Sequence, residues 1–181
     1  MKAGNDTTFL FPLQQVAKEV IAIRNTLGMY EASLEMREVR HEKVKQGIAA
    51  VEYFLNSEVQ QGGNRKWTIH THKHCTQANN YLIELQDISK ELSSDLFTEC
   101  QQMLSKCERF KHTAEIYLRS QERNQSAAFL PFVLEVLHVI AVVQDKVISL
   151  HCQAIDERLS IQTTIGHTSE ILESVQEINN P

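Results

Sequence analysis

Three histidines and a cysteine lie close together near the middle of the chain, at His70, His72, His74 and Cys75. Imidazole and thiolate groups are the usual protein ligands of zinc and copper. In an extended segment all three histidines would share one face, whereas in a helix only His70 and His74 would lie together, one turn apart. We expect the helical case, with solvent-facing histidines that bind no metal tightly, and we keep the metal site as the alternative.

Two Glu-x-x-His pairs are the other residues that could bind metal, Glu38 with His41 and Glu135 with His138. Helical bundles that hold two iron or manganese ions carry such a pair on each of two helices, with a further glutamate on each of the other two. The remaining glutamates of this chain have no apolar pocket predicted around them. The sequence also contains no phosphate-binding loop, dinucleotide-binding loop or serine elbow. We therefore predict a chain that is not an enzyme and uses no cofactor.

The cysteines that remain are predicted to be structural. Cys100 and Cys107 lie seven residues apart within a pattern of buried residues, and Cys152 lies in a segment that we expect to be buried. The chain has four cysteines without a CxxC pair and shows no secretory signal, which favours free thiols in a reducing cytoplasm.

Charge limits the classes of partner. The formal net charge is −5 at pH 7, and lysine and arginine form no run anywhere in the chain. Binding to nucleic acid normally requires a basic face, so this class is excluded from the prediction. Recruitment to an anionic membrane surface is disfavoured for the same reason.

A seven-residue repeat of apolar residues dominates the first third of the chain. Steps of seven from Leu13 and from Val16 meet apolar residues everywhere except at Arg37, His41 and Glu58. Such a repeat is typical of a coiled-coil seam. It predicts a helix over residues 12–60 with Pro12 at its first position.

Arg37 and His41 form a polar layer within this predicted seam. Polar seam residues fix the register or the partner of a helix and lower its stability. We therefore expect the double substitution Arg37→Leu and His41→Leu to raise the melting temperature.

Two further helices are predicted, over residues 71–122 and 130–179. In the second helix Leu92, Leu96 and Cys100 follow one another at steps of four, a stutter that should locally unwind the supercoil. The third helix is apolar on nearly every side in its first half, and Gly166 is the point at which it could kink or break.

These elements predict an all-α fold in one domain over residues 1–181, with three long antiparallel helices in an elongated, coiled-coil-like bundle. Two neighbouring helices would not cover the first half of the third helix, so we expect a second copy to cover it in a homodimer. Phe9, Phe11 and Trp67 are expected to cap the bundle ends. The residues predicted to carry interactions are Arg37, His41, Trp67, Phe132, Leu134 and Val139.

The predicted function is that of a cytoplasmic scaffold or adaptor, which self-associates and binds a protein partner through helical surfaces. The layout is similar in outline to BAR-type dimerisation modules and to spectrin-like bundles, although no motif of either family is present. A BAR-like membrane-binding dimer is the first alternative, and a metal-binding helical bundle is the second.

Overall fold

The computed structural model describes residues 7–61, 69–123 and 129–179, and it is helical through nearly all of them. Helix α1 spans Thr7–Gln61 and α2 spans Ile69–Glu91. A π-helical segment, η2, covers Leu92–Leu96 and leads directly into α3, Phe97–Arg123. Helix α4 spans Leu130–Asn179. The described residues contain no strand, so the predicted all-α class is confirmed, and each predicted helix lies within an observed helical stretch.

The predicted seam of α1 is buried. All seven residues of the repeat that starts at Leu13 are buried, including His41. In the second repeat Val16, Ile23, Val44 and Val51 are buried, and Tyr30 and Arg37 are half-buried. A repeat of 3.5 residues keeps one stripe of a helix facing its neighbours. The spacing of these side chains therefore determines which face of α1 enters the core.

The predicted stutter coincides with η2. A π-turn contains one more residue than an α-turn, because its hydrogen bonds join residues five apart. The wider turn allows side chains at steps of four to point in the same direction. Leu92, Leu96 and Cys100 are accordingly all fully buried. Ser93 lies within this segment, and its hydroxyl donates to the carbonyl of Ser89 over 3.1 Å.

Helix α4 buries a strict repeat of small and branched side chains. Its members are Val133, Ile140, Val147, Ala154, Ile161, Thr168 and Val175, all buried. The helix continues through Gly166, where a Cβ atom would meet nothing within 4 Å. The kink or break considered at Gly166 does not occur, because one glycine costs a helix only about 1 kcal/mol.

Helix α1 begins before the position predicted for it. Pro12 lies inside the helix, five residues after Thr7. Proline lacks an N–H group, so one hydrogen bond of the α-helical ladder is lost there. The loss falls close to the helix end, where the ladder is already incomplete.

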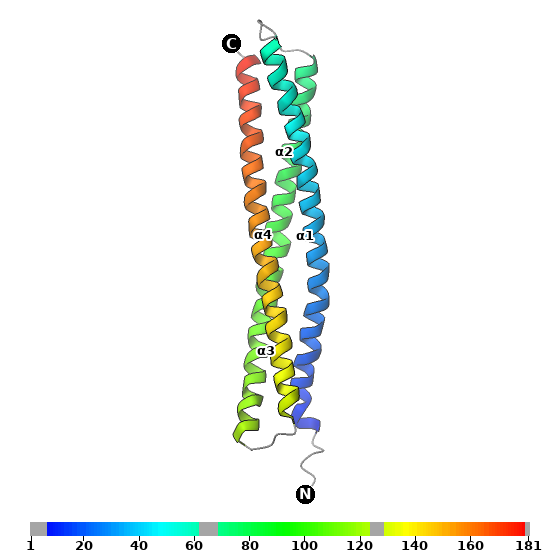
Figure 1. The fold of residues 1–181 in the computed structure, drawn as a ribbon, viewed down its shortest axis with the longest axis vertical. Helices are drawn as coiled ribbons and strands as arrows, with labels where there is room; N and C mark the ends of the chain where they lie inside the picture. The colour runs from blue at the N-terminus through cyan, green and yellow to red at the C-terminus, as the bar shows by residue number, and fades with distance from the viewer. Residues whose placement is uncertain (1–6, 62–68, 124–128, 180–181) are drawn as a thin grey trace. The chain divides into compact units, whose positions relative to one another are not determined.

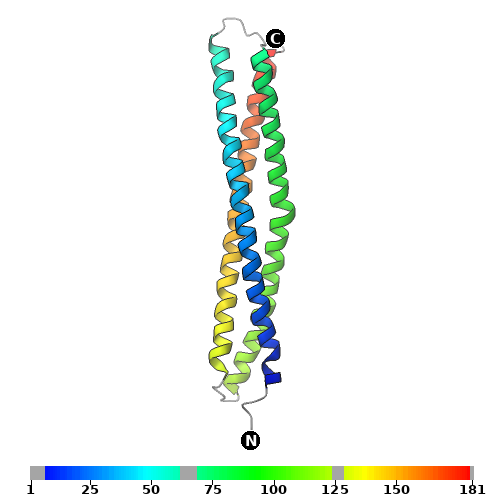
Figure 2. The same cartoon turned by 90° about the vertical axis from the view of Figure 1, so that its right-hand side faces the viewer.

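The chain divides into two compact units. Unit 1 combines residues 1–32 with 96–153, and unit 2 combines residues 33–95 with 154–181. By residue number, Figures 1 and 2 colour the two parts of unit 1 blue and green to yellow, and the two parts of unit 2 cyan to green and orange to red. Among the described residues, no helix has the length and hydropathy needed to cross a membrane.

Candidate functional site

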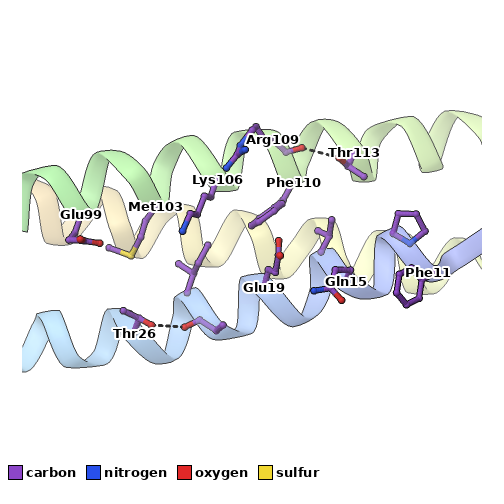
Figure 3. Close-up of a pocket in the computed structure, with 14 residues that line it drawn as sticks. Phe11, Gln15, Glu19, Thr26, Glu99, Met103, Lys106, Arg109, Phe110 and Thr113 are labelled. Atoms are coloured by element: carbon purple, nitrogen blue, oxygen red, sulfur yellow. Dashed lines mark hydrogen bonds between the residues drawn. The ribbon is translucent and has the colours of Figure 1, made fainter.

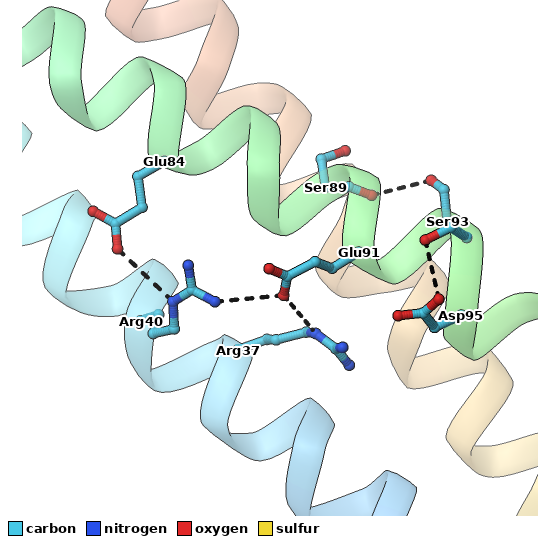
Figure 4. A network of polar contacts seen from close by, with 8 residues as sticks. Arg37, Arg40, Glu84, Ser89, Glu91, Ser93 and Asp95 are labelled. Carbon is cyan, nitrogen blue, oxygen red and sulfur yellow. Dashed lines mark hydrogen bonds and ion pairs between the residues drawn. The ribbon is translucent and has the colours of Figure 1, made fainter.

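Arginines of α1 make ion pairs with glutamates of α2 in unit 2 (Figure 4). Arg37 Nε lies 3.2 Å from Glu91 Oε2, and Arg40 Nη1 lies 3.4 Å from the same oxygen. A third pair joins Arg40 Nε to Glu84 Oε1 over 3.8 Å. The Arg37 side chain is largely buried, so its pair with Glu91 is less screened by water than the pairs of Arg40.

His41 makes the other polar contacts of this layer, with α4. Its Nδ1 lies 2.5 Å from Glu157 Oε1, and its Nε2 lies 3.0 Å from Thr164 Oγ1. The Thr164 hydroxyl donates its single proton to the carbonyl of Ser160, so its oxygen accepts from His41. A carboxylate also only accepts. Both ring nitrogens therefore lie within hydrogen-bond distance of an oxygen, Nδ1 at the Glu157 carboxylate and Nε2 at the Thr164 hydroxyl.

These partners change the expectation for the polar layer. The predicted gain in stability on replacing Arg37 and His41 by leucine assumed that both side chains lacked buried partners. Glu157 retains 14% exposure and would lose its partner in the absence of His41. Removing one member of a buried pair is strongly destabilising, because it leaves a charge with poor solvation. With these partners present, we expect the double substitution to lower the melting temperature.

Two ring contacts also join α1 to α2. A Cβ atom at Gly47 would lie 2.5 Å from Tyr81 Cζ, so the absent side chain leaves room for the Tyr81 ring. The Phe54 ring stacks on the ring of His74, with centroids 4.8 Å apart and an interplanar angle of 10°. At Gly47 an aromatic ring of α2 therefore packs on α1, and two turns later Phe54 of α1 packs on a ring of α2.

The histidine cluster lies in the first turns of α2, which excludes the extended arrangement. His70 and His72 are exposed, whereas His74 is half-buried against Phe54. Cys75 packs against a small apolar cluster in unit 2 that contains Val51 and Leu55. The four residues therefore differ in their surroundings. His70 and His72 are exposed, and His74 and Cys75 pack against α1 or the apolar cluster.

The Glu-x-x-His pairs are also placed differently. Glu135 and His138 are exposed on α4. His41 uses both ring nitrogens for Glu157 and Thr164 and offers neither to a metal ion. Within the described ranges, no group of three or more histidine, cysteine, aspartate or glutamate side chains could hold a metal ion.

The cysteines differ in exposure. Cys100 and Cys107 are fully buried on α3, as predicted, and Cys152 is exposed on α4, which corrects the prediction. Burial, followed by the charge of Glu99, raises the pKa of Cys100 to about 11. Burial and the charge of Glu108 raise the pKa of Cys107 as well. Both buried thiols are therefore poor nucleophiles, since the thiolate is the reactive form.

An open groove runs between α1 and α3 in unit 1 (Figure 3). We call it the α1–α3 groove, and its volume is about 760 Å³. Helix α1 contributes Phe11, Pro12, Gln15, Val16, Glu19, Ala22, Ile23 and Thr26, and α3 contributes Glu99, Met103, Lys106, Arg109, Phe110 and Thr113. Phe11 keeps 65% exposure on this wall, so it lines the groove and does not form the packed cap expected of it.

The groove combines an apolar base with charged edges. Val16, Ile23 and Met103 are buried at its base, and Phe110 is half-buried. Lys106 and Arg109 lie one turn apart on α3 and make no ion pair with any described residue. Two cationic side chains beside an apolar strip are suited to a ligand that is itself amphipathic.

The residues predicted to carry interactions on α4 are partly accessible. Leu134 is 49% exposed, whereas Phe132 and Val139 are half-buried. Ile148 and Val142 are also exposed on the same helix. Trp67 and the Phe9 side chain lie outside the described residues.

The sequence reasoning did not identify the α1–α3 groove. The available signal was the series Pro12, Glu19 and Thr26 at steps of seven, beside Gln15 and Ala22. These side chains are short or polar at positions that flank a seam.

Comparison of the chain with family models, curated proteins and solved structures gave no match.

Proposed function

We propose that this chain is a non-enzymatic helical scaffold or adaptor, which self-associates and binds a protein partner through its helical surfaces. The dimer is the smallest associated form in this proposal. Within each unit the helices are proposed to pack in an up-down-up, antiparallel and coiled-coil-like arrangement.

The order of contacts supports this packing. In unit 2, higher residue numbers in α1 are paired with lower residue numbers in α2, from Arg37–Glu91 to Phe54–His74. Higher residue numbers in α1 are paired with higher residue numbers in α4, from His41–Glu157 to Glu52–His167. Opposite trends of this kind are typical of neighbouring helices that run in opposite directions.

The observation that carries self-association is the exposed apolar face of α4. Leu134 is 49% exposed and Ile148 is 47% exposed, beside a repeat of fully buried residues on the same helix. Exposed apolar side chains that recur on one helix face gain free energy when a partner removes them from water, about 25 cal/mol per Å².

Light scattering over a range of micromolar concentrations tests the proposal. The expected result is a mass above the 20.7 kDa of the single chain, reduced to that value by Leu134→Glu with Ile148→Glu. Ile21→Glu is the matched control, because Ile21 is exposed on α1. A wild-type mass equal to that of one chain throughout the range would overturn the proposal.

A further inference from the structure

We infer that the α1–α3 groove of one copy binds the exposed face of α4 from a second copy, so that the chain associates head to tail. This inference rests on the self-association proposed above and assigns the two surfaces that meet. It requires agreement in length, in apolar pattern and in charge, and each can be examined on the described residues of unit 1.

The groove and the unit 1 part of the exposed α4 face have similar lengths. The groove extends from Phe11 to Thr26 on α1 and from Glu99 to Thr113 on α3. Within unit 1 the exposed face of α4 extends from Leu134 to Ile148, and along the same helix exposed apolar residues continue to Ile155 and Leu159. At 1.5 Å per residue each of these segments covers about 20 Å, or about four helical turns.

The apolar patterns are complementary. Leu134, Ala141 and Ile148 are exposed and lie seven residues apart, so they form one stripe along α4. A helix that docks in a groove inserts side chains with this spacing between the two lining helices. The groove offers Val16, Ile23 and Met103 at its base.

The charges also fit. Glu135 and Asp145 are exposed beside the apolar stripe of α4. Lys106 and Arg109 line the groove, as do the carboxylates Glu19 and Glu99. None of these residues makes an ion pair with another described residue of its own chain. Glu135 and Asp145 lie about 15 Å apart along α4 and the two cations about 4.5 Å apart along α3, so one α4 carboxylate of one copy would face Lys106 and Arg109 of the next, which favours one register of the two surfaces.

The α1–α3 groove and the exposed face of α4 are two different surfaces. The groove is lined by α1 and α3, whereas the exposed α4 side chains face away from the helices against which α4 packs. A contact between two different surfaces leaves one of each kind free on every pair. Such a heterologous contact continues beyond the dimer unless the copies close into a ring.

Charge reversal on each surface tests the inference with the full chain. Lys106→Glu with Arg109→Glu, and separately Glu135→Lys with Asp145→Lys, should each weaken association at least about tenfold in sedimentation or light scattering. A mixture of the two double variants should recover association to within about threefold of wild type, because each then presents the opposite charge to the other. The surfaces left over in the mixture, the unchanged α4 face of one variant and the unchanged groove of the other, also carry opposite charges, so the mixture should associate past pairs as the wild type does.

Two further variants separate the possible outcomes. Ala22→Trp fills the groove without changing charge and should also weaken association, whereas Lys111→Glu, on an exposed residue of α3 outside the groove, should not. Wild-type mass should keep rising with concentration past two chains. If Leu134→Glu with Ile148→Glu abolishes association while the Lys106 and Arg109 reversal and Ala22→Trp leave it intact, the groove is not the acceptor and the inference fails, although the proposed self-association stands. A wild-type chain that remains a monomer overturns both.

Discussion

One face of α1 makes side-chain contacts with α2 in unit 2 and lines an open groove in unit 1. Steps of seven along this face give Pro12, Glu19 and Thr26 in unit 1, and Arg40, Gly47 and Phe54 in unit 2. In unit 2 these three residues contact Glu84, the Tyr81 ring and the His74 ring of α2, in that order. In unit 1 the equivalent residues line the α1–α3 groove.

The difference shows that the seam and its flanks have separate roles. The repeat that starts at Leu13 is buried in both units, so core packing does not explain why the flanking face contacts α2 in unit 2 and lines a groove in unit 1. The contacts at the flanking positions differ instead. Arg40 and Phe54 contact α2 and the Tyr81 ring lies over Gly47, whereas Pro12, Glu19 and Thr26 line a groove. The predictions below test this comparison, beginning with the largest expected effect.

His41→Leu should break the polar layer of unit 2 and lower the free energy of unfolding by about 3 kcal/mol. The substitution leaves the Glu157 carboxylate without its His41 partner at a largely buried position. Urea denaturation measures the change. The double variant His41→Leu with Glu157→Leu should lose less stability than the single variant, because no buried charge remains. A single variant as stable as wild type would show that Glu157 gains other partners.

Glycine substitutions should separate open positions from the one that accommodates Tyr81. Gly28→Ala and Gly166→Ala should each raise the free energy of unfolding by about 0.5–1 kcal/mol, since alanine favours helix and a Cβ meets nothing within 4 Å at either position. Gly47→Ala should not stabilise, because its Cβ would lie 2.5 Å from Tyr81 Cζ. Thermal unfolding of the three variants in parallel gives the comparison. Equal gains at all three positions would mean that the Tyr81 ring moves aside without cost.

Thr26→Arg should convert part of the open face into a bridged one. Thr26 is the unit 1 equivalent of Arg40, and Glu99 lines the opposite wall of the same groove. An exposed ion pair of this kind should add about 0.5 kcal/mol of stability. Thr26→Gln is the matched control, because it lengthens the side chain without adding charge. The gain in arginine over glutamine should disappear in high salt, and a gain that persists would not come from an ion pair.

Glu38→Gln should have the smallest effect and depend on pH. Burial, followed by the charges of Glu157 and Glu35, raises the pKa of Glu38 above its usual value of about 4.5. Ionisation of Glu38 is therefore easier in the unfolded chain, so the wild type loses some stability as pH rises from 4.5 through the raised pKa. At pH 7 the variant should be slightly more stable than the wild type, by no more than about 0.5 kcal/mol. At pH 4 the two proteins should have the same melting temperature. A difference that is the same at both pH values would exclude this cause.

The buried seams could be predicted from the sequence because a helix repeats with a known period. The seam of α1, the stutter of η2 and the buried thiols Cys100 and Cys107 all depend only on spacing along one helix. The exposure of Cys152 could not be predicted in this way, because the first half of α4 carries apolar residues on nearly every side. Spacing then no longer distinguishes the buried face from the exposed face.

The contacts between helices required the structure. The partners of His41 lie 116 and 123 positions further along the chain, and nothing in the local pattern determines the axial offset between α1 and α4. The groove depends on the same information, because an opening exists only where short side chains on one helix face short or separated side chains on the next. Predicting either feature from one sequence would require the register of each helix pair.

The π-turn of η2 has a consequence for changes in chain length. Removing one residue from an ordinary α-helix rotates everything beyond the deletion by about 100° and would bring seam residues to the surface. Removing exposed Ser94 would instead shorten the step from Leu92 to Leu96 from four residues to three. The burial pattern from Ile88 to Cys107 would then alternate steps of four and three, as in a regular heptad. A deletion of one residue within 92–96 would therefore keep the same side chains buried in α2 and α3.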